Sequence, residues 1–289
     1  MTIITDPRCT EYAAPGHPER PERVSRTVEL LKSRPPSLFR WELPPEAGEK
    51  ALLRAHSPGH LQRLGQPEDF DADTPTYPHI ADHARRSVGG AVRALALARD
   101  GEPALSLLRP PGHHATRDRV MGFCYLNSVA IAALEAQATG CQRMAVFDFD
   151  VHHGNGTEDI LLDKPGMLFI SIHQHPCYPG TGVANRGKNC FNFPVRPHIP
   201  RAEYRAVLEK AFAKLKEFRP DLVAVSAGFD SYVHDPLAQG TLEREDFHWI
   251  GESLRAMRVP AFSVLEGGYS EELPRLILAY IHGLNGWAL

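Results

Sequence analysis

The segment DFDVHH, at residues 148–153, places two aspartates and two histidines within six positions. Carboxylates and imidazoles bind metal ions and transfer protons, so the segment suits a metal site or a proton relay, and a polar His-rich loop is the third reading. If the apolar run before it continues as a strand, Asp148, Asp150 and His152 share one face, with His153 elsewhere. An Asp-x-His pair then supplies one oxygen and one nitrogen ligand, and a third ligand must come from another segment.

The best-placed third ligand is Asp230, in the motif AGFD. Two carboxylates and one imidazole leave an open position on the metal, which is typical of catalytic zinc, and iron(II) accepts the same donors. Two alternatives stay open: Asp150 and His152 could only hydrogen-bond the loop backbone, and Asp148 could orient a histidine instead of binding metal.

Groups suited to proton transfer occur in two further motifs. His113 and His114 follow a Pro-Pro-Gly bend, and neighbouring histidines with different partners can have their pKa values pushed apart. Tyr269 follows Gly267 and Gly268 and could donate its hydroxyl to a developing oxyanion. The simpler alternatives are a buried histidine bonded to a carbonyl and a tyrosine that only packs.

Short apolar runs precede all of these groups. The predicted strands are 104–108, 143–147, 167–172, 221–226 and 259–265, and the predicted helices are 20–33, 80–99, 126–138, 201–218, 244–257 and 271–284. Continuously apolar strands indicate a mostly parallel sheet with helices on both faces. We therefore predict an α/β fold with one three-layer α/β/α domain over residues 1–289, in which the Pro-rich stretches 34–45 and 66–78 are surface loops. Ligands bind at the carboxyl edge of such sheets, where the segments after the five strands should meet.

Composition excludes several other classes of function. The formal net charge is −3 without a long basic block, which argues against direct nucleic acid binding. Five cysteines without a CxxC pair argue against a disulfide framework and favour a reducing compartment. The N-terminal residues lack a secretory pattern, and no apolar run approaches the ~20 residues that cross a membrane. We expect a cytoplasmic protein without membrane contact, and no pattern predicts its oligomeric state.

Seven motifs, in order along the chain, resemble the histone deacetylase family, and the class II-like branch with its bacterial deacetylases is most similar. They are HPERPER (17–23), DADT (71–74), RPPGHHA (109–115), GFCYLN (122–127), DFDVHHGNGT (148–157), GFD with DPL (228–237) and EGGY (266–269). The resemblance implies an arginase-like α/β fold and a zinc-dependent amide hydrolase. It assigns zinc to Asp150, His152 and Asp230, tandem catalytic roles to His113 and His114, and oxyanion binding to Tyr269.

The resemblance also implies roles for residues around these groups. Gly122, Phe123 and Tyr178 resemble the walls of the acyl-lysine channel, and Tyr178 stands where phenylalanine is common, so the channel should be more polar. Gly268 and the rim residue Asp73 are further substrate-binding candidates. A structural potassium ion is implied at Asp148, His152, Ser171 and Ile172, partly through backbone carbonyls. Arg23 resembles a buried arginine near the acetate exit.

The expected reaction removes acetyl or other acyl groups from N-acetyl-lysine in proteins or peptides and releases acetate. His114, oriented by Asn155, is the expected general base, whereas His113 faces Asp148 and should carry positive charge more readily. The main alternative substrates are small acetylated amines such as acetylpolyamines. Leu237 disfavours them, because polyamine-selective members of the family carry an acid at this place. Two more distant alternatives are an inactive acyl-lysine binding module and a binuclear-manganese ureohydrolase.

Overall fold

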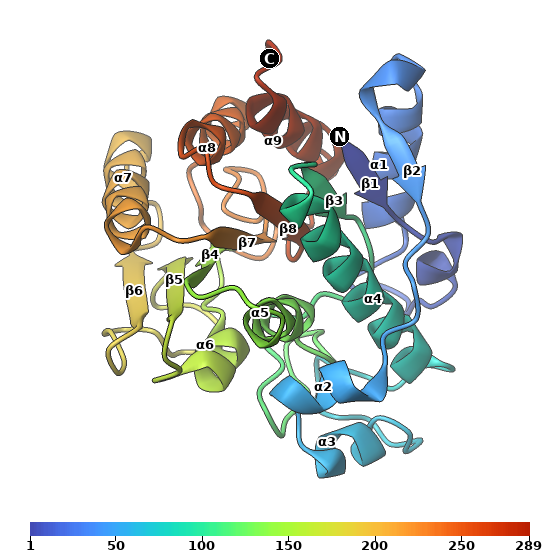
Figure 1. The fold of residues 1–289 in the computed structure, drawn as a ribbon. Helices are drawn as coiled ribbons and strands as arrows, with labels where there is room; N and C mark the ends of the chain where they lie inside the picture. Colours follow the sequence, from blue (N-terminus) through green and yellow to red (C-terminus); the bar gives the residue numbers. More distant parts are fainter.

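A single parallel sheet of eight strands runs through the computed structural model, which describes residues 1–289 (Figure 1). The strands are β1 (Thr2–Ile4), β2 (Arg40–Glu42), β3 (Ala104–Ser106), β4 (Met144–Asp148), β5 (Met167–Gln174), β6 (Cys190–Val195), β7 (Leu222–Ala227) and β8 (Ala261–Leu265). Their order in the sheet is β2-β1-β3-β8-β7-β4-β5-β6, and every pair is parallel. All carboxyl ends therefore lie at one edge.

Helices cover both faces of the sheet (Figure 1). They are α1 (Glu22–Lys32), α2 (Glu49–Ala55), α3 (Pro58–Arg63), α4 (Ile80–Arg99), α5 (Ser128–Ala138), α6 (Asn155–Leu161), α7 (Arg201–Phe218), α8 (Arg244–Ala256) and α9 (Leu273–Asn285). Helices α2, α4, α5 and α6 contribute to one buried core, and α1, α7, α8 and α9 contribute to the other. None of the helices is long and apolar enough to span a bilayer.

The two cores explain why the strands read as continuous apolar runs. In β4, Met144 and Val146 belong to the core under α4 and α5, whereas Ala145 and Phe147 belong to the core under α7, α8 and α9. Successive side chains of a strand point to opposite faces, so a strand that is covered on both faces needs apolar residues at every position. The predicted three-layer architecture with a parallel central sheet is confirmed.

Local signals set the ends of several helices. Asn127 begins α5 because its side chain accepts the N–H of Ala130 at 3.0 Å. At α8, the side chain of Glu243 caps the first turn while the backbone N–H of Glu243 donates to Asp246 at 2.7 Å. Helix α9 ends at Asn285 and is followed by Gly286, which has a φ of 70° that suits glycine.

The structure contains three strands and three helices beyond those predicted. Strands β1 and β2 have three residues each, too few to show a period, and β2 lies within 34–45, which is therefore not entirely a surface loop. The sequence of β6, CFNFPV, mixes polar and apolar residues because β6 is an edge strand. The short helices α2, α3 and α6 likewise offer too few turns for a clear apolar stripe.

Candidate active site

The loops after β4 and β7 form a buried group of two carboxylates and one imidazole. Strand β4 ends at Asp148, so Asp150 and His152 lie in the loop after it and not on a continued strand. The Nδ1 atom of His152 lies 3.1 Å from Asp150 Oδ1 and 3.1 Å from Asp230 Oδ2. One ligand atom from each of the three residues lies within 4.8 Å of the others, and all three residues are buried.

This donor set fits a single divalent cation. Neither Asp150 nor Asp230 has a lysine or arginine partner, although both are fully buried. Burying two carboxylates is costly unless a positive charge compensates them, and a bound metal ion supplies that charge. A buried Asp-His-Asp group of this kind could hold a metal ion.

Backbone groups orient the two carboxylates. Gly267 N–H donates to Asp150 Oδ2 at 2.7 Å, and Val151 N–H donates to Asp230 Oδ1 at 2.9 Å. A Cβ atom at Gly267 would lie 2.0 Å from Asp230 Oδ2, and one at Gly228 would lie 2.1 Å from Asp150 Oδ2. Glycine is therefore required at both positions, because the carboxylates pack directly against the backbone there.

The two histidines after β3 have different partners. His113 Nδ1 lies 3.0 Å from Asp148 Oδ2, whereas His114 Nδ1 lies 2.7 Å from Asn155 Oδ1. The second oxygen of Asp148 accepts Asp150 N–H at 3.1 Å, so this carboxylate orients both His113 and the loop that carries the metal-binding group.

These partners separate the pKa values of the histidines, as the sequence suggests. Burial disfavours charge on His113, but the carboxylates of Asp150 and Asp148 outweigh it and raise the pKa of His113 to about 10. Burial, the largest cause, together with the charge of His113, lowers the pKa of His114 well below its ordinary value. His114 is therefore neutral and able to accept a proton. A cation on Asp150 would cancel part of the field at His113, and the Asp148 contact would remain.

A cavity of about 320 Å³ leads to these groups and is lined by His114, His152 and Tyr269. Its walls include Gly122, Phe123, Tyr178, Leu237 and, at the exposed rim, Asp73. Gly122 has a φ of +57°, and a Cβ atom there would lie 2.5 Å from His114 Cδ2, so only glycine lets this wall approach the histidine. The sequence-derived wall residues are thus brought together.

Three residues that the sequence nominated do not line the cavity: Gly268, Ser171 and Ile172. Gly267, rather than Gly268, lines the cavity, because Gly268 directs its carbonyl oxygen to Arg23 Nε at 2.7 Å. Asp148 and Ser171 are register partners on β4 and β5, and Ile172 follows Ser171 within β5.

A buried ion-pair network, which our sequence reasoning missed, supports the loops from behind. Glu19 Oε1 lies 3.1 Å from Arg23 Nη1 and 2.5 Å from Arg109 Nε. Arg23 also donates to the carbonyl of Glu266, whose carboxylate accepts Gly112 N–H at 2.7 Å and His113 N–H at 3.1 Å. The network joins the segments that carry His113 and Tyr269. Two features of the sequence could have indicated this network: the charged residues inside HPERPER and the glutamate directly after the apolar run 259–265.

The fold and the site were compared with proteins of known structure. The crystal structure of an acetylpolyamine aminohydrolase from Burkholderia pseudomallei superposes with a TM-score of 0.91 at 28% identity, covering 99% of this chain and 98% of that one. The shared fold and the buried Asp-His-Asp group make the chain an amidohydrolase of the arginase–deacetylase fold.

Sequence comparison then identifies the family. The family model described as "Histone deacetylase domain" matches residues 17–284, and the chain belongs to that family. A "Probable deacetylase" from Methanothermobacter thermautotrophicus is 40% identical over 99% of this chain and 91% of its own length. A "Histone deacetylase-like amidohydrolase" from Pseudomonas aeruginosa is 36% identical over 95% of this chain and 78% of its own length. The sequence-derived family resemblance is confirmed.

Proposed function

We propose that the protein is a zinc-dependent deacetylase that removes acetyl groups from N-acetyl-lysine in peptides or proteins and releases acetate. One observation carries the proposal: His114, His152 and Tyr269 line the same cavity, and His152 contacts the buried carboxylates of Asp150 and Asp230. A pocket with a neutral base, a hydroxyl donor and a metal-binding group suits hydrolysis of an amide. The proposal includes action as one domain over residues 1–289, in a cytoplasmic setting that suits five free cysteines.

The proposed ion is zinc, held by Asp150, His152 and Asp230, and iron(II) would accept the same donors. When bound there, it would polarise the acetyl carbonyl and lower the pKa of water. We also propose a structural potassium ion at Asp148, Ser171, Ile172 and His152. Because the His152 ring faces the other two zinc-binding residues, His152 would contribute its backbone carbonyl to that second ion.

The side chains of this protein supply the proton transfers. Asn155 Oδ1 accepts a hydrogen bond, so His114 carries its proton on Nδ1 and offers Nε2 as the base toward the attacking water. Burial raises the pKa of Tyr269 well above its ordinary value, so the phenol stays protonated. Its hydroxyl can therefore donate a hydrogen bond to the oxyanion. His114 then passes the water-derived proton to the leaving amine, which departs as the free amine.

Replacing Tyr269 by phenylalanine should lower kcat by roughly 10²–10³, as expected for loss of one oxyanion donor. The phenylalanine ring keeps the contacts with Phe123 and Arg23, so stability should change little. Steady-state kinetics and a melting curve test this. The matched control is Tyr232→Phe, since Tyr232 is equally buried but lines neither the channel nor its mouth. An unchanged kcat in Tyr269→Phe, or a loss explained by unfolding, would contradict the role.

At the position of Leu237, the channel mouth favours an acetyl-lysine peptide over an acetylpolyamine. Leu237 lies at the mouth and offers apolar contact to the methylene stem of a lysine. The nearest acid in the sequence, Asp235, is buried and turned inward, where it accepts Tyr269 N–H at 2.7 Å and Leu237 N–H at 3.0 Å. It therefore does not offer its carboxylate to a second ammonium. Acetylpolyamines remain the alternative substrate class because the chain is similar to an acetylpolyamine aminohydrolase.

Replacing Leu237 by glutamate should shift kcat/KM toward acetylpolyamines by roughly tenfold to a hundredfold. This is the expected effect of one hydrogen-bonded contact between the carboxylate and the second ammonium. The measurement is a turnover panel of acetyl-lysine peptides, longer acyl-lysines and acetylpolyamines on metal-defined enzyme. Val233→Glu is the control, because it adds the same charge to the same loop away from the mouth. If the wild type hydrolyses acetylpolyamines better than every acetyl-lysine peptide, the alternative substrate class replaces the leading one.

A further inference from the structure

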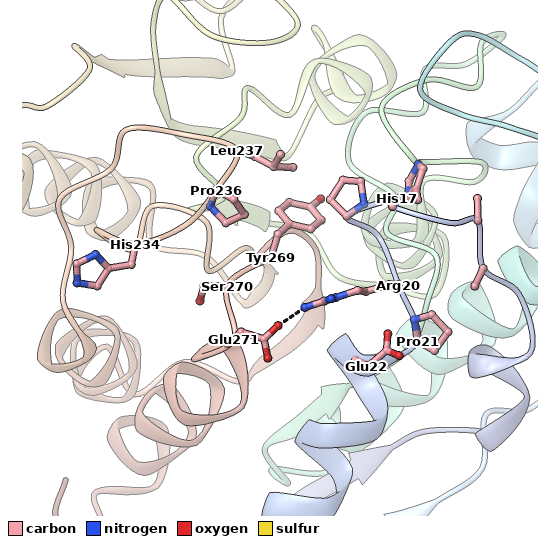
Figure 2. Close-up of a pocket in the computed structure, with 14 residues that line it drawn as sticks. His17, Arg20, Pro21, Glu22, His234, Pro236, Leu237, Tyr269, Ser270 and Glu271 are labelled. Carbon is pink, nitrogen blue, oxygen red and sulfur yellow. Dashed lines mark hydrogen bonds and ion pairs between the residues drawn. The ribbon is translucent and has the colours of Figure 1, made fainter.

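An open bowl of about 770 Å³ adjoins the mouth of the channel (Figure 2). Residues 13–22 form one wall, and residues 234–237 together with 269–271 form the other. His17, Pro18, Leu237 and Tyr269 line both the bowl and the channel. A group attached to the substrate at the mouth can therefore enter the bowl directly.

The size of the bowl favours a peptide as its occupant. Its 770 Å³ is more than twice the 320 Å³ of the channel, which must itself accept the acetylated side chain. The single methylene chain of a small amine would leave most of this space filled with water. The residues beside an acetyl-lysine in a peptide would occupy much more of it.

The charges of the bowl leave one carboxylate uncompensated. Arg20 forms an ion pair with Glu271 between the two walls (Figure 2). Arg26 also binds Glu271, so the carboxylate of Glu271 already has two arginine partners. Glu22, the first residue of α1, is exposed in the bowl and makes neither an ion pair nor a side-chain hydrogen bond. Glu22 is therefore the carboxylate of the bowl that is free to pair with a basic group of an occupant.

We propose that this bowl binds the residues beside the acetyl-lysine of a peptide substrate, and that Glu22 selects a basic side chain among them. This assignment rests on the proposed deacetylase function and adds a sequence preference to it. A lysine or arginine placed near Glu22 gains an ion pair, whereas a glutamate there meets a like charge.

The expected effect is modest, because Glu22 is exposed to water. A contact between exposed charges should favour the basic peptide by roughly two- to fivefold in kcat/KM. The preference should fade when the ionic strength rises from about 0.05 M to about 1 M, since the Debye length falls to about 3 Å.

The test is a competition assay with purified full-length protein. Two acetyl-lysine peptides that differ only in lysine or glutamate on either side of the acetyl-lysine are mixed, and mass spectrometry gives their kcat/KM ratio. We expect the wild type to favour the lysine peptide and Glu22→Gln to bring the ratio close to one. Glu29→Gln, an exposed glutamate two turns further along α1 and outside the bowl, should keep the wild-type ratio.

Equal turnover of the two peptides by wild type, or an unchanged ratio in Glu22→Gln, would overturn the subsite. A capped acetyl-lysine without flanking residues is run in parallel. If the wild type hydrolyses this capped substrate while either negative result is obtained, the subsite is refuted but the deacetylase function is not. Failure of wild type to hydrolyse any of the three substrates would instead refute the proposed function, and the subsite with it.

Discussion

Replacing Asp230 by alanine should remove both the bound metal and the activity. Asp230 is the only residue of the metal-binding group that comes from the loop after β7, and its loss leaves Asp150 and His152 as two ligands on one loop. Loss of a residue that only supports a metal ligand costs about 10–100-fold, so loss of a ligand itself should cost more. Metal content per protein chain and turnover of an acetyl-lysine peptide are measured on the same preparation.

Two further variants make the Asp230 result decisive. Asp230→Asn keeps the shape of the side chain and should also lose metal, which separates ligand loss from unfolding. Asp100→Ala, an exposed aspartate at the end of α4 without a side-chain partner, should keep metal and activity. Full metal content in a folded Asp230→Ala protein would refute the ligand assignment.

Replacing His114 by alanine should lower kcat by about 10²–10⁴, the usual contribution of a general base. His113→Ala should retain more activity, because His113 pairs with Asp148 and is proposed to hold a charge rather than to move protons. Both variants are compared on one peptide substrate, with melting curves as a check on folding. Since His114 lines the channel, added imidazole should restore part of the turnover of His114→Ala.

The order of damage discriminates between the two histidines. A larger loss in His113→Ala than in His114→Ala, with both proteins folded, would mean that their roles are exchanged. Equal losses without rescue by imidazole would indicate that the pair acts as one structural unit.

The local pattern of apolar and polar residues was sufficient to predict the main strands that carry the site. Apolar runs predicted β3, β4, β5, β7 and β8 to within a few residues, because a strand buried on both faces needs apolar side chains throughout. The polar segments that follow these strands could then be placed at one edge, since parallel strands end on the same side. Most of the proposed channel and metal residues follow from that placement and from the motifs.

Short and peripheral elements could not be predicted in this way. Strand β2 has three residues with little burial, and β6 contains both asparagine and proline, so neither has the apolar signature of a central strand. These strands form because a neighbouring strand already presents unpaired backbone groups, which is a property of the assembled sheet.

The sequence by itself therefore determined which chemical groups are present and which strand each of them follows. Only the tertiary structure decided which of these groups meet. Asp150 and Asp230 are far apart along the chain, and they share His152 because β7 lies beside β4 in the sheet order. The Glu19 network behind the loops and the unpaired Glu22 of the bowl likewise depend on contacts between distant segments. Strand order and such contacts are set by packing of the whole chain, which no local period records.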